Sequence, residues 1–229
     1  MNAPLTRTAA SDAVEPIGWR YLLGAYQTCV ITDDLAGAVG AAACAVAACG
    51  IDADTHLRVD VRPGRVDLVL QDLSTGAVVA RDVELAFGIT DSIRDLGFDT
   101  VAAPLTSRPV QMLEIAIDTL DIAAIRPFWK AVLAYVDDPG PDAPQNALVD
   151  PLREGPAFWF QKMDQPRPQR NRIHFDITVA HDQAQQRIAA ALAAGGTMVS
   201  DAAARSFWIL ADVEGNEICV CTWQDRDPL

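Results

Sequence analysis

The sequence predicts an α+β protein in two parts, a small N-terminal unit followed by paired β-α-β-β-β modules that form a concave cleft. In the second half, residues 112–118 and 172–178 both alternate apolar and polar side chains as strands do, and each runs into a helix-like stretch. Between the halves, residues 101–109 contain two prolines and no periodic pattern, which is typical of an interdomain linker. We therefore expect domains over residues 15–100 and 110–225.

The N-terminal unit is predicted from alternating strand and helix signals. Its alanine-rich helix follows Asp33 and Asp34, either of which could cap it. Gly64 gives the backbone freedom needed for a tight reversal between two strands. The predicted elements are a strand over 21–32, a helix over 35–51, strands over 57–61 and 65–70, and a helix over 81–96 that ends near Gly97.

The second half is predicted to contain the same module twice. Phe128 and Val132 in the first helix match Ile188 and Leu192 in the second at the same offset. Gly215 and Asn216 form a strong turn signal between the last two alternating strands. The remaining predicted elements are a proline-rich loop over 137–151, a strand over 157–163, a connector over 164–170, and a closing hairpin of strands 206–211 and 217–223.

Composition excludes several classes of function. The chain has 229 residues, half of them hydrophobic, and a formal net charge of -13, so binding to nucleic acid or to an anionic membrane surface is disfavoured by repulsion. The long apolar run over 35–51 is mostly alanine and glycine, which predicts a soluble helix rather than a membrane span. Residues 1–16 lack the apolar core of a signal peptide. We therefore expect a cytoplasmic protein.

The five cysteines predict neither a disulfide framework nor a structural zinc site. Their number is odd and no two have the C-x-x-C spacing. Cys219 and Cys221 lie two apart on one strand and share a face, so they cannot easily bond to each other. We expect reduced, buried thiols.

Two motifs in the second half resemble the hallmark strands of a known superfamily. They are residues 171–176, Asn-Arg-Ile-His-Phe-Asp, and residues 214–221, Glu-Gly-Asn-Glu-Ile-Cys-Val-Cys. Together with the repeated β-α-β-β-β module, they resemble the glyoxalase-like branch of the vicinal-oxygen-chelate superfamily, which includes glyoxalases, extradiol dioxygenases and bleomycin-resistance proteins. The resemblance covers the region 110–225.

This resemblance implies a divalent-metal site. In the superfamily the ligands lie on the first and last strands of the modules, and carried over by position they are Glu114, His174 and Glu217. Glu217 lies as far beyond His174 as Ala157 lies beyond Glu114. Such a set suits Mn²⁺, Fe²⁺ or Zn²⁺ acting as a Lewis acid on a substrate with adjacent oxygens, with Glu217 also catalytic, in a lyase, isomerase or dioxygenase. The alternative is a metal-free pocket, lined by the same three residues, in a binding or resistance protein.

Candidate substrate-binding residues share these strands. Tryptophans at 159, 208 and 223 are predicted to line or flank the cleft, where aromatic walls suit a planar ligand. Arg172 shares the His174 face with Asp176, and the two either support the ligand set or form a surface ion pair. The predicted substrate-binding residues are Trp159, Gln161, Asp176, Trp208 and Cys219.

The N-terminal unit resembles pterin-4a-carbinolamine dehydratase. The residues that carry this resemblance are the alanine-rich helix, the stretch Asp54-Thr55-His56-Leu57, and residues 59–70 and 81–86. The family uses a His-His-Pro motif and a later histidine, whereas this chain has Thr55, Leu57 and Leu73 at three of these four positions. We expect a retained shape with lost catalysis, the alternative being pterin binding or 4a-hydroxytetrahydrobiopterin dehydration through His56.

These resemblances imply a small-molecule ligand as the partner. They also imply a homo-oligomer, because members of both families commonly pair through sheet edges or helices. The sequence does not fix the number of subunits.

Overall fold

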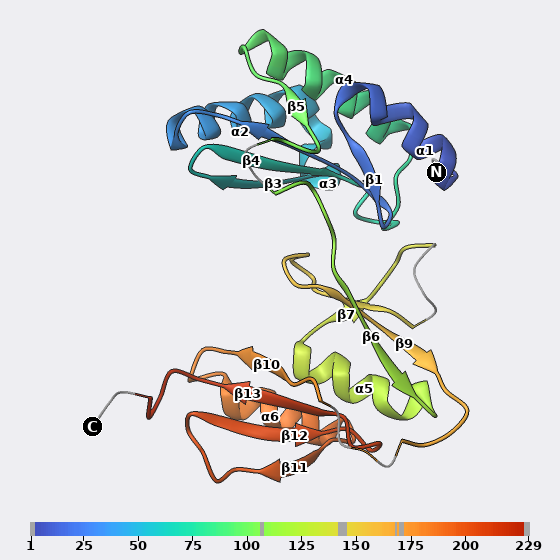
Figure 1. The fold of residues 1–229 in the computed structure, drawn as a ribbon, viewed down its shortest axis with the longest axis vertical. Helices are drawn as coiled ribbons and strands as arrows, with labels where there is room; N and C mark the ends of the chain where they lie inside the picture. The colour runs from blue at the N-terminus through green and yellow to red at the C-terminus, as the bar shows by residue number, and fades with distance from the viewer. Residues whose placement is uncertain (1–2, 106–107, 142–145, 168, 170–171, 227–229) are drawn as a thin grey trace. The chain divides into compact units, whose positions relative to one another are not determined.

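The structure is a computed structural model that describes residues 3–105, 108–141, 146–167, 169 and 172–226. Its contacts divide the chain into two compact units, residues 1–112 with 139–143, and residues 113–138 with 144–229. Both units mix helices with antiparallel or mixed sheets (Figure 1), which confirms the predicted α+β class.

The first unit is a five-stranded sheet with helices packed on it. The strands run in the order β1-β2-β4-β3, and β5 pairs with β2. The main helices α2 and α4 pack against each other and lie on the same side of the sheet in Figure 1. The strands are β1 (Arg20–Leu22), β2 (Ala25–Ile31), β3 (Leu57–Arg62), β4 (Arg65–Leu70) and β5 (Thr100–Val101). The helices are α1 (Arg7–Val14), η1 (Glu15–Ile17), α2 (Leu35–Cys49), η2 (Gly50–Asp52), α3 (Ala53–His56) and α4 (Ala80–Asp95).

Helix α2 begins where the sequence predicted. The Asp34 side chain accepts a hydrogen bond from the Gly37 backbone N–H at 2.8 Å, so Asp34 is the cap. Ala38, Ala41 and Ala45 on this helix are fully buried. By length and composition alone, residues 35–56 could cross a membrane, which is weak evidence because core helices of soluble proteins pass the same test.

The predicted strand over 21–32 is two strands in the structure. Leu23 and Gly24 have φ angles of +46° and +80°, and this left-handed pair reverses the chain between β1 and β2. The prediction of one strand was wrong because the run of apolar residues continues through the turn without a polar interruption.

The predicted linker stays with the first unit. Thr100 and Val101 pair with β2, the Val110 N–H donates to the Ala102 carbonyl at 2.9 Å, and Arg65 donates to the Arg108 carbonyl at 2.7 Å. The division between the units therefore falls after residue 112.

The second unit consists of two β-α-β-β-β modules. The first sheet has the order β6-β9-β8-β7 and the second the equivalent order β10-β13-β12-β11. In both, the first and last strands pair in parallel with partners 43 positions apart, Glu114 with Ala157 and Phe175 with Ile218. The elements of the first module are β6 (Glu114–Thr119), α5 (Ile122–Leu133), β7 (Val136–Asp137), β8 (Leu148–Val149) and β9 (Ala157–Lys162). Those of the second are β10 (Phe175–Thr178), α6 (Ala184–Ala193), β11 (Thr197–Ser200), β12 (Phe207–Ala211) and β13 (Glu217–Cys221).

One hydrophobic core joins these two modules. Phe128 and Trp129 of α5 are almost fully buried and belong to the same cluster as Trp208 and Ile218 of the second module. The Trp129 ring stacks on Phe158 with centroids 5.8 Å apart. The two modules therefore share one core, and the side chains packed between them are held in place by it.

Candidate functional site

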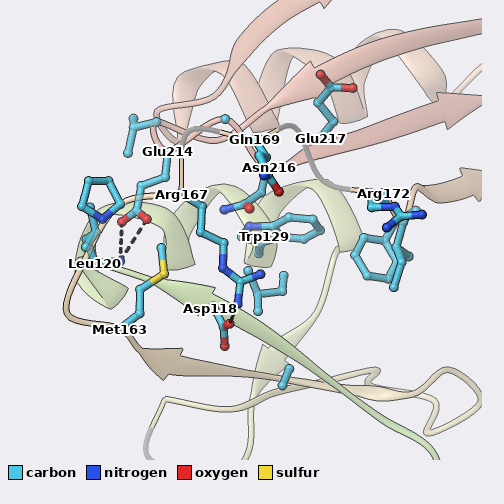
Figure 2. Close-up of a pocket in the computed structure, with 17 residues that line it drawn as sticks. Asp118, Leu120, Trp129, Met163, Arg167, Gln169, Arg172, Glu214, Asn216 and Glu217 are labelled. Atoms are coloured by element: carbon cyan, nitrogen blue, oxygen red, sulfur yellow. Dashed lines mark hydrogen bonds and ion pairs between the residues drawn. The ribbon is translucent and has the colours of Figure 1, made fainter.

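The second unit contains a cavity of about 590 Å³ where its two modules meet. The walls come from the end of β6, the connector between β9 and β10, and the turn before β13 (Figure 2). Ile117, Trp129 and Phe175 are apolar lining residues. The charged lining residues are Asp118, Arg167, Arg172, Glu214 and Glu217. A cavity of this size, with an apolar lining and a few polar groups, suits a small organic ligand.

Buried Asp212 shapes the turn that forms one wall. Its carboxylate accepts hydrogen bonds from the Trp129 indole N–H at 2.9 Å, from the Glu214 N–H at 2.9 Å and from the Asn216 N–H at 3.0 Å. Asp212 is 2 % exposed, so these bonds are made in a low-dielectric setting. The indole that lines the cavity and the turn that borders it are thus held by one carboxylate.

Glu214 ties this turn to the first module. Its carboxylate accepts hydrogen bonds from the Thr119 hydroxyl at 2.7 Å, the Leu120 N–H at 2.9 Å and the Asp121 N–H at 2.9 Å. Partial burial alone would raise the pKa of Glu214, but these donors outweigh burial and lower it. Glu214 is therefore an anion whose hydrogen bonds connect the two modules.

Two arginines on the connector line the cavity in different ways. Arg167 forms an ion pair with Asp118 of β6 at 2.8 Å, so their charges offset each other. The exposed guanidinium of Arg172 makes no hydrogen bond or ion pair in the structure as described, and Figure 2 shows it apart from the Arg167–Asp118 pair. The sequence predicted Arg172 only as a supporting residue and did not single out Arg167 or Asp118.

Of the three predicted metal ligands, only Glu217 lines the cavity. Half-buried Glu114 opens β6, and exposed His174 immediately precedes β10. Within the described ranges, no three His, Cys, Asp or Glu side chains are grouped so that they could hold a metal ion. Glu114, His174 and Glu217 therefore do not fit a preformed three-ligand site in this conformation, and their role in metal binding stays a prediction.

The predicted substrate-binding residues are distributed over both faces of the sheets. Trp159 and Gln161 pair with Ala116 and Asp118, which line the cavity, but neither is itself in the lining. Trp208 is 6 % exposed and packs in the core. Its placement beside the cleft needs correction, because residue 208 pairs with Val220 and shares the core-facing side of its sheet.

Cys219 and Asp176 are neighbours on the opposite face of the second sheet. They are register partners, and neither lines the cavity. Burial, and then the bond to Asp176, raises the pKa of the Cys219 thiol to about 12, so it is protonated at neutral pH. Cys219 is therefore not activated as a nucleophile, because the thiolate is the reactive form. All five cysteines of the chain are free thiols.

Trp223, predicted to flank the cleft, lies outside the cavity. Its ring is 61 % exposed, and its indole N–H donates to His181 Nδ1 at 3.2 Å. Trp129 of α5 is the tryptophan that lines the cavity.

In the first unit, His56 has a buried acidic partner that the sequence did not identify. His56 Nδ1 lies 2.8 Å from Asp82 Oδ1, and the other Asp82 oxygen accepts the Val79 N–H at 2.7 Å. The Asp82 side chain is fully buried and that of His56 is 12 % exposed. Burial raises the pKa of Asp82, opposed by these two partners. Leu73, which stands where the resembled family has its later histidine, is 37 % exposed.

The second unit contains a region that matches a known family of domains. Residues 114–221 match the family model described as a glyoxalase-like domain, and the match covers both modules from β6 to β13. The resemblance inferred from the motifs around His174 and Gly215 is confirmed for this part of the chain, which is a little under half of its length.

Several solved structures are similar to this chain at low identity. Fosfomycin resistance protein FosX from Mesorhizobium loti is 8% identical over 50% of this chain and 92% of its own, with a TM-score of 0.40. A glyoxalase/dioxygenase from Nostoc punctiforme is 16% identical over 57% of this chain and 99% of its own, with a TM-score of 0.39. A transcriptional coactivator/pterin dehydratase from Brucella melitensis is 22% identical over 39% of this chain and 98% of its own, with a TM-score of 0.36. A search of the curated proteins found no match. None of these similarities bears on the activity of this chain.

Proposed function

We propose that the glyoxalase-like unit binds a small organic molecule in the cavity between its two modules. The observation that carries this proposal is the cavity itself, whose apolar lining is held by the buried Asp212–Trp129 bond. Rigid walls favour binding because little conformational entropy is lost when the ligand enters.

A compound screen by thermal shift, followed by calorimetric titration, tests this proposal. Ala116 is exposed and lines the cavity, so Ala116→Phe should fill it and weaken binding of any hit about ten-fold or more. Ala190→Phe adds the same ring at an exposed site on α6 outside the cavity and should leave binding unchanged. Equal affinity in wild type and Ala116→Phe would place the ligand elsewhere.

The metal-dependent form of this proposal is a lyase, isomerase or dioxygenase that uses Mn²⁺, Fe²⁺ or Zn²⁺. It requires Glu114, His174 and Glu217 to converge. The metal content of the same preparations, purified without chelator, separates the two forms. Near-stoichiometric metal that is lost in Glu217→Ala favours the enzyme, and its absence from the wild type favours the metal-free binding or resistance protein.

A second candidate function is pterin binding by the first unit. It is supported by His56, whose Nδ1 is fixed at 2.8 Å from buried Asp82. Acid–base catalysis contributes a factor of about 10²–10⁴, and with Thr55 and Leu73 at two positions where the family has histidines, we expect binding without turnover.

A fluorescence titration with a pterin and an assay on 4a-hydroxytetrahydrobiopterin test this second candidate. Binding that weakens in His56→Ala, with no turnover in the wild type, is the expected result. Turnover that disappears in His56→Ala would show instead that the unit is a working dehydratase. Homo-oligomer formation and a cytoplasmic location stay predictions.

A further inference from the structure

We propose that the cavity of the glyoxalase-like unit selects an organic anion and that Arg172 binds its oxyanion group. This inference rests on the proposed function, since it names the ligand class of the same cavity. The inference depends on which charged side chains of the cavity lining already have a hydrogen-bond or ion-pair partner.

The acidic groups of the lining already have partners. Asp118 is paired with Arg167 at 2.8 Å, and Glu214 accepts hydrogen bonds from one hydroxyl and two backbone N–H groups. Glu217 also has an interaction of its own. A cationic ligand would have to displace these partners, which is unfavourable because hydrogen bonds to a charged group are stronger than those between neutral groups.

Of the two arginines in the lining, Arg167 is paired with Asp118 and Arg172 is not balanced in the same way. Arg172 is exposed at the cavity and has no hydrogen-bond or ion-pair partner in the structure as described. An arginine presents a planar fork of donors that matches the two oxygens of a carboxylate, phosphate or phosphonate. An incoming oxyanion therefore gains a charge-assisted contact without breaking one.

The charge of the connector between β9 and β10 also favours a negatively charged ligand. Among the described residues between β9 and β10, Arg167 and Arg172 line the cavity, although the whole chain carries a net charge of -13. The Arg167 charge is offset by Asp118, so the guanidinium of Arg172 is the basic group of the lining that attracts an anion to the cavity. The rest of the surface repels anions.

The apolar lining defines the other end of the ligand. Ile117, Trp129 and Phe175 can cover a hydrocarbon or aromatic body, while Arg172 holds the charged group at the rim. The expected class is therefore a small amphipathic anion, such as an aromatic carboxylate or phosphonate.

Calorimetric titration with matched probes tests this inference on the full chain. Benzoate and phenylphosphonate are compared with neutral benzamide, which has nearly the same shape as benzoate. We expect both anions to bind at least ten-fold more tightly than benzamide, and Arg172→Gln to remove this difference while benzamide affinity stays the same. Arg172→Lys should restore part of it. Arg94→Gln, which removes an exposed arginine of the first unit, is the control for net charge and should change nothing.

The outcomes separate the two proposals. If benzamide binds as tightly as benzoate, and Ala116→Phe weakens both, the cavity is a binding site but the anion inference is wrong. If no probe binds the wild type, or if Ala116→Phe has no effect on those that do, the inference fails together with the proposed site. Anion binding that falls equally in Arg172→Gln and Arg94→Gln would reflect net charge alone and would also overturn it.

Discussion

At the scale of the residue, Glu214 connects the two modules of the glyoxalase-like unit. Replacing it with glutamine keeps the shape but removes the charge that three donors on the β6–α5 corner stabilise. Because hydrogen bonds to a charged group are worth about 1.5–3 kcal/mol, we expect Glu214→Gln to lower the unfolding free energy of this unit by about that amount at pH 7. Urea unfolding followed by tryptophan fluorescence measures it, and exposed Glu154→Gln is the matched control.

The same substitution should show a defined pH dependence. The folded-state pKa of Glu214 lies below its ordinary value of 4.5, so the stabilisation is complete above about pH 4.5 and is lost as pH falls through the lowered folded pKa. The difference in stability between wild type and Glu214→Gln should therefore shrink below about pH 4.5. A difference that is the same at pH 7 and pH 3 would contradict this account of the charge.

The sequence predicts the region of the site more accurately than the residues that line it. Glu217, carried over by position from the superfamily's last strand, lines the cavity, and its role as a metal ligand stays a prediction. Trp208 was misplaced, since an aromatic residue on an alternating strand gives no indication of which face is buried. The Asp118–Arg167 pair joins residues 49 positions apart, and such a contact cannot be predicted from local sequence patterns. The basic connector was visible in the sequence and could have indicated Arg172.

At the scale of the element, most of the predicted segments are present. The repeat predicted the equivalence of the two modules, and the shared spacing of 43 residues between paired strands confirms it. Alternation and capping have a period or a fixed position, so α2, β3, β4 and α4 could be placed from local sequence alone. The turn at Leu23–Gly24 was missed because leucine at a positive φ has no sequence signal.

At the scale of the whole molecule, the chain has two hydrophobic cores that share no residue among those described. Ile89 is fully buried in the first core and Ile125 in the second. Truncating a buried isoleucine to alanine costs about 2–5 kcal/mol, and each kcal/mol lowers the Tm of a domain of this size by roughly 4–8 °C.

Because the cores are separate, we expect calorimetry of the full chain to show two unfolding transitions. Ile89→Ala should lower the Tm of one transition by roughly ten degrees or more, and Ile125→Ala should lower the other by a similar amount. A ligand of the cavity should raise only the transition that Ile125→Ala lowers, because ligand binding stabilises the unit that contains the site. One transition that shifts equally in both variants would mean that the chain unfolds as a single cooperative unit, and the division after residue 112 would then have no thermodynamic meaning.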